Sequence, residues 1–257
     1  MPVHNAPDAL VRTLASIHAQ GVDCQVFVVD DGSTPPLGMD AAPCRDRLTL
    51  IRLDERQGVT AALNAGLRHI LAGPIEYIAR LDAGDEDVCD RLAKQVDFLD
   101  RHADTVLVGA WTSHRDRAGK ELFVSEHPTS WAGIRRRMRY RAAFSHSACM
   151  LRASALRRFG GYDARYDIAQ DFELFWRLAA SAPCANIPEV LVARIEEPGS
   201  VTVSRRARSA WVRLMIQAKY FSLADPHATF GIVRSLLALM VPWRLVFAYK
   251  KAVHVIR

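Results

Sequence analysis

Short apolar runs alternate with segments of helical periodicity along the first half of this chain. Four apolar runs have the length and composition of buried strands, and they cover residues 25–29, 48–53, 76–81 and 105–111. Three segments space their apolar side chains three and four positions apart, as amphipathic helices do, and they cover residues 8–20, 58–71 and 87–102. This alternation predicts an α/β fold with a mostly parallel, twisted sheet flanked by helices.

The second half of the chain is less regular. Its pattern predicts two helices and two strands, over residues 131–140, 169–181, 147–151 and 190–195. Beyond residue 204 come two helical stretches, which Asp225 and Pro226 interrupt. We therefore expect an α/β domain over residues 1–203 and a helical C-terminal tail over residues 204–257.

Residues 1–5 have the composition of the segment that follows a strand rather than of the strand itself. No apolar run precedes residues 2–5, whereas a parallel sheet of this kind opens with an apolar strand. We therefore expect the first strand to be missing and the native protein to begin upstream of Met1. Without that strand, residues 26–29 would lack a partner, and an unpaired strand edge invites aggregation or pairing with another chain.

The charge of the chain is unevenly distributed. The net charge is +6, yet residues 204–257 hold ten Lys and Arg against Asp225, which gives +9 there and 6 − 9 = −3 for residues 1–203. A basic tail of this kind favours a polyanionic surface. Nucleic acid is disfavoured, because the tail has few interleaved aromatic residues and the main domain is acidic.

The uncharged runs of the tail are also too short to cross a membrane. Its longest uncharged run, residues 235–243, has nine residues, against the roughly 20 that span a bilayer. Residues 230–256 therefore predict a basic amphipathic helix lying on an anionic leaflet, and the alternative is a helix packed on the domain. The five scattered cysteines form no C-x-x-C pair, which indicates reduced thiols in a cytoplasmic protein and neither a zinc site nor a disulfide framework.

Two acidic segments follow predicted strands. They read Val-Val-Asp-Asp-Gly-Ser at 28–33 and Arg-Leu-Asp-Ala-Gly-Asp-Glu-Asp at 80–87. Carboxylates at the ends of neighbouring strands face the crevice where α/β sheets bind ligands, and a cation or a hydrogen-bond donor relieves their repulsion. Mg²⁺ or Mn²⁺ with a phosphate-bearing ligand suits such oxygen donors. Taken alone, the first segment is equally well a turn and the second a helix cap, and Asp87 is interpreted as a cap only.

Eight ordered blocks then resemble the family 2 inverting glycosyltransferases of the GT-A fold. The resemblance runs over roughly residues 1–205, and its blocks are Pro2-x-His4-Asn5, residues 28–33, residues 58–66, residues 82–85, Arg91 with Gln95, residues 146–152, residues 160–162 and residues 170–174. Two positions depart from the family pattern. Gly84 stands where the family has its second metal-side Asp, and Gln170 replaces the Glu that precedes the catalytic base.

The resemblance implies an enzyme that moves a sugar from a nucleotide-sugar donor to a hydroxyl of a polysaccharide or glycolipid acceptor, with inversion. It assigns Asp171 as the general base, and the alternative for this residue is a helix cap. Asp82 and Asp85 would hold Mg²⁺ or Mn²⁺, with a positive φ at Gly84 bringing Asp85 forward. The implied donor contacts are Pro2, Asn5, Asp30, Asp31, Ser33, Asn64 and Asp82.

Three further expectations concern His146, the location and the alternative function. His146 is either an acceptor or phosphate contact or a satisfied core histidine. The location expected is cytoplasmic, with peripheral binding to the inner face of the cytoplasmic membrane, and the partners are the donor, the glycan or glycolipid acceptor and an anionic membrane surface. The alternative function is a non-catalytic nucleotide-sugar-binding or scaffold protein, which the glycine at position 84 motivates.

Overall fold

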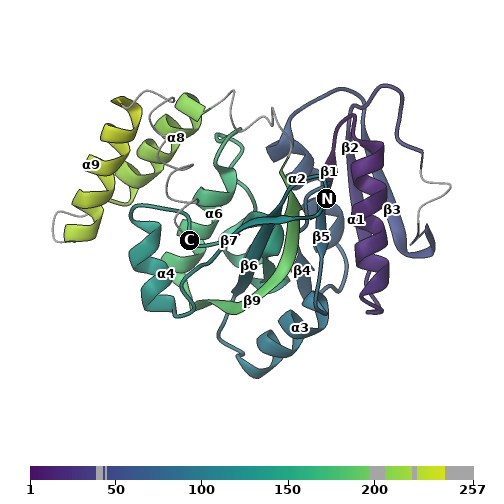
Figure 1. Ribbon diagram of the computed structural model, residues 1–257, viewed down its shortest axis with the longest axis horizontal. Helices are drawn as coiled ribbons and strands as arrows, with labels where there is room; N and C mark the ends of the chain where they lie inside the picture. The colour runs from purple at the N-terminus through teal and green to yellow at the C-terminus, as the bar shows by residue number, and fades with distance from the viewer. Residues whose placement is uncertain (39–42, 44, 197–205, 222–224, 241–257) are drawn as a thin grey trace.

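The computed structural model describes residues 1–38, 43, 45–196, 206–221 and 225–240, and it shows an α/β architecture (Figure 1). Its N-terminal sheet is parallel throughout, with β2 (Val26–Asp31) between β1 (Pro2–Val3) and β3 (Leu48–Leu53). The run predicted at 48–53 is therefore the edge strand of this sheet. Asp30 and Asp31 end β2, next to the turn that follows.

The larger sheet has six strands and mixed direction. Its order is β4 (Tyr77–Ala79), β8 (Met150–Arg152), β6 (Leu107–Arg115), β9 (Cys184–Ile195) and β5 (Asp85–Asp87), and β7 (Glu121–Ser125) pairs with β6. The pair β6–β9 is parallel, and the pairs β4–β8, β6–β8, β6–β7 and β5–β9 are antiparallel. The prediction of a mostly parallel sheet thus holds only for the N-terminal sheet. Short connections such as the one between β6 and β7 permit hairpins but not parallel crossovers.

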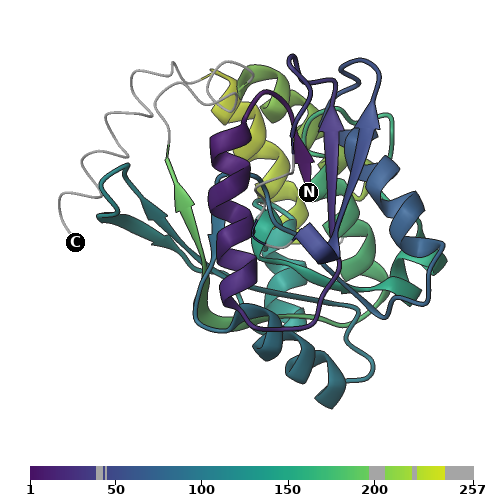
Figure 2. The same ribbon diagram turned by 90° about the vertical axis from the view of Figure 1, so that its right-hand side faces the viewer.

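Helices flank these sheets in both views (Figures 1 and 2). In chain order they are α1 (Pro7–Ala19), α2 (Val59–Leu71), α3 (Arg91–Arg101), α4 (Trp131–Met138), α5 (Ala153–Phe159) and α6 (Gln170–Ser181), with 3₁₀ turns η1 (Arg45–Arg47) and η2 (His146–Ala148). The largest apolar cluster packs α2, α5 and α6 against the sheet, and it includes Leu63, Leu107 and Phe172. Phe172, Phe175 and Trp176 are buried there, as predicted for core residues.

The acidic run before α3 departs from the prediction. Asp85–Asp87 forms β5, and the helix begins only at Arg91. Asp87 is therefore not the cap, and Asp90 occupies that position. The buried Asp87 carboxylate instead lies 2.7 Å from the Arg91 guanidinium, because an acid inside the sheet requires a countercharge.

The N-terminal segment forms a strand of only two residues. Pro2–Val3 is itself a strand, pairing with Val29 and Asp30 of β2. A cavity of about 560 Å³ lies between β2 and β4, and its lining includes Phe27 and Ile78. The two sheets are therefore separated beside the first half of β2.

The C-terminal segment forms a helical hairpin of α8 (Arg206–Lys219) and α9 (Pro226–Met240), separated near Asp225 as predicted. It lies beyond α4 and α6, at the end of the molecule away from β3 (Figure 1). Ile216 enters the main core, and the Tyr220 ring stacks on Trp176 with centroids 5.2 Å apart. Within the residues described, no helix has the length and apolar character that crossing a bilayer requires. Residues 241–257, which hold most of the predicted amphipathic helix, lie outside the described residues.

Candidate active site

The Asp30 carboxylate shapes the turn after β2. It is fully buried and accepts hydrogen bonds from the backbone N–H of Ser33 at 2.9 Å and of Leu37 at 3.2 Å. The Arg52 guanidinium on β3 donates to it at 2.5 Å. Burial alone would raise the pKa of Asp30, but these contacts hold it below its ordinary value. The carboxylate is thus committed to the backbone around it.

Asp31 and Asn5 are bonded in a similar way. Asp31 accepts from the N–H groups of Gln57 at 2.7 Å and of Gly58 at 2.9 Å, which join β2 to the start of α2. The Asn5 N–H donates to the Ser33 hydroxyl at 2.9 Å, and the Asn5 side chain accepts from Thr34 at 2.8 Å. The predicted donor contacts at the ends of β1 and β2 therefore converge on one turn.

Asp82 and Asp85 meet at a single hydroxyl group. Ser147, in η2, donates a hydrogen bond to the Asp82 carboxylate at 3.0 Å, and its oxygen is also in hydrogen-bonding contact with the Asp85 carboxylate. Between the two acids, Gly84 adopts φ +101°, a value that L side chains rarely take. The positive φ predicted at Gly84 is confirmed, and Asp85 lies at the same hydroxyl as Asp82.

Cationic and neutral groups complete this cluster. The buried Arg80 guanidinium forms an ion pair with Asp82 and donates from Nε to His146 Nε2 at 3.2 Å. The Tyr162 hydroxyl lies 2.8 Å from the same nitrogen. Because Nε2 accepts from Arg80, we assign the proton of neutral His146 to Nδ1, which lies 3.9 Å from Asp82.

The charges in this cluster oppose one another. Burial works to raise the pKa of Asp82, but the Arg80 guanidinium holds it below its ordinary value. Burial raises the pKa of Asp85 to about 6, with Arg194 opposing and Asp82 adding to the shift. Burial and Arg80 lower the pKa of His146 to about 4, so the ring is neutral at physiological pH. Perturbed groups gathered in this way are typical of functional sites.

Asp171 lies in the first turn of α6 and adjoins this cluster. Its charge acts on His146, Tyr162 and Arg194, which places the three groups within electrostatic reach of the carboxylate. The N-terminus of a helix favours a negative charge. The predicted base thus lies on a helix that packs against this cluster, since Phe175 of α6 meets the His146 ring with centroids 5.9 Å apart, whereas Asp30 and Asp31 lie at a separate turn.

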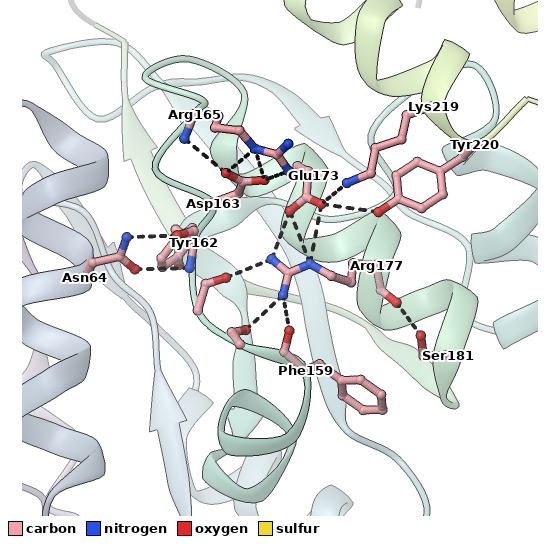
Figure 3. A network of polar contacts seen from close by, with 12 residues as sticks. Asn64, Phe159, Tyr162, Asp163, Arg165, Glu173, Arg177, Ser181, Lys219 and Tyr220 are labelled. Carbon is pink, nitrogen blue, oxygen red and sulfur yellow. Dashed lines mark hydrogen bonds and ion pairs between the residues drawn. The ribbon is translucent and has the colours of Figure 1, made fainter.

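The wall beside Tyr162 is held by a polar network (Figure 3). Asn64 on α2 donates to the Tyr162 carbonyl at 2.8 Å and accepts from its N–H at 3.1 Å. The Arg177 guanidinium donates to the carbonyl oxygens of Phe159, Gly160 and Gly161, and it pairs with buried Glu173 at 2.9 Å. Asn64, predicted as a donor contact, thus positions the loop that carries Tyr162.

Several functional residues had no assigned role in the sequence. Arg80, Ser147, Tyr162 and Arg194 belong to this group, although the first three stand inside or beside quoted blocks. The signal available for Arg80 was its position shortly before Asp82 and Asp85 in the sequence. The blocks also contained Arg91, which donates to the carbonyl oxygens of Arg80 at 3.0 Å and Ser147 at 2.6 Å and so fixes both segments.

Comparison with known proteins establishes the family. The family model described as Glycosyl transferase family 2 matches residues 1–164, and the chain belongs to this family. An uncharacterized glycosyltransferase of Haemophilus influenzae is 30% identical over 217 residues, covering 80% of this chain and 78% of its own. The amylovoran biosynthesis glycosyltransferase AmsE of Erwinia amylovora is 26% identical over 259 residues, covering 95% and 94%.

Solved structures show the same fold. TarS residues 1–349 of S. aureus, in complex with UDP-GlcNAc, matches with a TM-score of 0.66 at 15% identity, over 89% of this chain and 67% of that one. The mannosyltransferase PcManGT of Pyrobaculum calidifontis, in complex with GDP-Man and Mn²⁺, matches with a TM-score of 0.59 at 19% identity, over 99% and 79%. The protein is thus a family 2 glycosyltransferase, and the predicted GT-A fold is confirmed.

Proposed function

We propose that this glycosyltransferase transfers a sugar, with inversion, from a nucleotide-sugar donor to a hydroxyl of a polysaccharide or glycolipid acceptor. The observation that carries the proposal is the convergence of Asp82 and Asp85 on Ser147, next to His146, which packs against α6, the helix that carries Asp171. Related proteins in complex with UDP-GlcNAc or with GDP-Man and Mn²⁺ support the donor class.

Asp82 and Asp85 fit a divalent cation only in combination with the donor. Among the residues described, no group of three His, Cys, Asp or Glu side chains is arranged to hold a metal. Two carboxylates suffice for Mg²⁺ or Mn²⁺ when substrate phosphates supply further oxygen ligands. When bound, the cation would stabilise negative charge on the departing diphosphate. Arg80 and Arg194 already balance part of the acidic charge.

Asp171 performs the proton transfer in this proposal. As the acceptor oxygen bonds to the anomeric carbon, its proton passes to the Asp171 carboxylate. The bond from that carbon to the diphosphate oxygen breaks, and its electron pair leaves with the nucleoside diphosphate. Attack from the face opposite the leaving group inverts the anomeric carbon without a covalent intermediate. Tyr162 and neutral His146 lie beside Arg80 and Asp82 and would contact the acceptor or a phosphate.

The donor nucleotide would lie along the ends of β1 and β2. Pro2, Asn5 and Ser33 would border it, Asp31 would accept from the nucleobase or ribose, and the fully buried Asp30 would keep the turn in shape. The proposal places the enzyme in the cytoplasm, peripherally at the inner face of the membrane. The net charge of +9 in residues 204–257 supports that location.

A panel of nucleotide sugars tests the proposal. A specific donor should increase the free energy of unfolding by RT ln(1 + [L]/Kd) and so raise the melting temperature. The increase should be larger in the presence of Mn²⁺. Incubation with a matching glycan or glycolipid should then yield product of inverted anomeric configuration by NMR. A donor that binds without hydrolysis or transfer under any of these conditions would instead identify a binding or scaffold protein, and retained configuration would contradict the inverting mechanism.

A further inference from the structure

Exposed apolar side chains gather on the C-terminal hairpin. Within the described residues, seven of the eleven exposed large hydrophobic side chains lie between Trp211 and Leu237. Five of them, with about half of their surface accessible, define what we call the outer face of the hairpin: Trp211, Met215, Phe230, Val233 and Leu237. Single exposed hydrophobic residues are ordinary on a protein surface, whereas such a concentration marks an interaction site.

The spacing of these residues makes a stripe on each helix. Phe230, Val233 and Leu237 follow one another at three and four positions along α9, and Trp211 and Met215 are four apart on α8. The sequence therefore gives each helix a second apolar face besides the one that it packs on the protein.

The other faces of both helices are tightly packed. Ile216 is fully buried, and a Cβ atom at Gly231 would lie only 2.0 Å from the Arg139 carbonyl oxygen. Ser235 donates to Gln217 at 2.6 Å, which joins α9 to α8. The hairpin is therefore seated with both stripes about half exposed, and Phe230, at the margin of its stripe, also meets the Tyr140 ring of the main domain edge to face, with centroids 5.9 Å apart.

The segment that carries this face is strongly basic, with a net charge of +9 over residues 204–257. The sole acid of residues 204–257, Asp225, pairs with Arg139 of the main domain at 2.9 Å. Arg213 lies over the Phe172 ring at 5.8 Å and Arg234 donates to the Tyr140 carbonyl at 2.8 Å, so both guanidinium groups reach toward the main domain. Four more basic residues follow in the sequence after α9, at Arg244, Lys250, Lys251 and Arg257. An exposed apolar face on a segment of this charge matches an anionic bilayer, in which acyl chains take the apolar side chains and headgroups attract the basic segment. A nucleic acid would satisfy only the charge.

We propose that the outer face docks on a membrane surface rich in anionic phospholipids. The functional meaning of this docking rests on the proposed function, because it would hold the active site near a membrane-borne acceptor. Figure 3 shows the physical link between the two: Lys219 Nζ and the Tyr220 hydroxyl reach Glu173 at 3.1 and 3.2 Å. Glu173 lies on α6, two residues from Asp171, so the docked hairpin and the base belong to one packed unit.

Sedimentation of the full chain with vesicles tests the docking. The probes are vesicles of phosphatidylglycerol and phosphatidylcholine in about equal parts, and vesicles of phosphatidylcholine alone. We expect binding to the first and at least tenfold weaker binding to the second, with release by high salt. The double variant Val233→Ser/Leu237→Ser should bind the anionic vesicles at least tenfold more weakly and keep its melting temperature, since both side chains are exposed. Val11→Ser/Leu122→Ser, which alters exposed apolar residues elsewhere, is the matched control and should bind like the wild type.

Three results would overturn the proposal. The first is equal binding of the wild type to neutral and anionic vesicles, or no binding to either. The second is unchanged binding of Val233→Ser/Leu237→Ser, which would assign retention to charge alone. The third is a wild-type dimer in light scattering that this double variant dissociates, which would mean that a second copy covers the face. Donor binding and hydrolysis, measured without vesicles, report separately on the proposed function.

Discussion

The two acidic regions of this glycosyltransferase use the same residue type in different ways. At the end of β2, Asp30 and Asp31 accept hydrogen bonds from backbone N–H groups, and the pKa of Asp30 is lowered. In the region after β4, Asp82 and Asp85 share one hydroxyl, and burial raises the pKa of Asp85 to about 6. A carboxylate satisfied by its own backbone maintains architecture, whereas carboxylates crowded against one another are prepared for a ligand.

The largest effect should come from Asp171→Asn. The amide cannot take the proton from the acceptor hydroxyl, so transfer should fall roughly 100-fold or more while donor affinity stays unchanged. Initial rates and calorimetric titration with the donor measure the two quantities. Asp97→Asn, on the exposed surface of α3, is the control. Transfer at nearly the wild-type rate would remove Asp171 from the mechanism.

Asp30→Asn should act on stability instead of chemistry. Loss of its charge weakens the bonds from Ser33, Leu37 and Arg52, which should lower the free energy of unfolding by about 1–3 kcal/mol at pH 7. Because the folded-state pKa is lowered, this stabilisation is present above the ordinary value of 3.8 and is lost as the pH falls through the folded-state value. Urea unfolding at neutral and acidic pH measures the difference, and a gap between wild type and variant that stays constant with pH would contradict this account.

Gly84→Ala should weaken the acidic site through the backbone. A Cβ atom there would meet only Ala9 at 3.8 Å, so the cost is the positive φ, about 1–2 kcal/mol, and not a clash. Displacement of Asp85 should lower metal-dependent donor affinity about tenfold, on the scale of 1.4 kcal/mol per decade. Gly119→Ala, at φ +82° in the turn between β6 and β7, carries the same strain away from the site and should leave donor affinity unchanged. Equal donor affinities in the two variants would show that the backbone at Gly84 does not affect donor binding.

Lys219→Met should have the smallest effect. Its side chain is 42% exposed, so the contact with Glu173 contributes less than about 1 kcal/mol to stability. Thermal unfolding measures this value, with Lys94→Met as a control at another exposed ion pair. A loss of several kcal/mol would show that the hairpin holds the acidic site more firmly than this comparison implies.

Periodicity predicted the elements that depend on local pattern. The edge strand at 48–53, the helix beginning near Gly58 and the break near Asp225 follow from apolar spacing and from residues that end helices. The direction of β8 and β5 cannot be predicted from local pattern, because strand pairing is determined by contacts between distant segments. Asp87 shows the same limit, since an acid before a helix resembles a cap until the burial of Arg91 is known.

The candidate site was predictable in its residues more than in its arrangement. Asp82, Asp85, Asp171 and His146 could be selected from short motifs, and their meeting requires Gly84 and the segments fixed by Arg91. The counterions were harder to foresee. Arg194 comes from the far end of β9 and reaches Asp85 only because β5 pairs with that strand.

Manganese binding in the presence of a nucleoside diphosphate tests the division between the two acidic regions most directly. Electron paramagnetic resonance of Mn²⁺ titrated into wild type, Asp85→Ala and Asp30→Asn would measure the amount and affinity of bound Mn²⁺ in each protein. We expect wild type and folded Asp30→Asn to bind Mn²⁺ alike, and Asp85→Ala to lose that binding because one of only two carboxylate ligands is gone. Unchanged affinity in Asp85→Ala, or a loss confined to Asp30→Asn, would contradict the assignment of the metal to the region after β4.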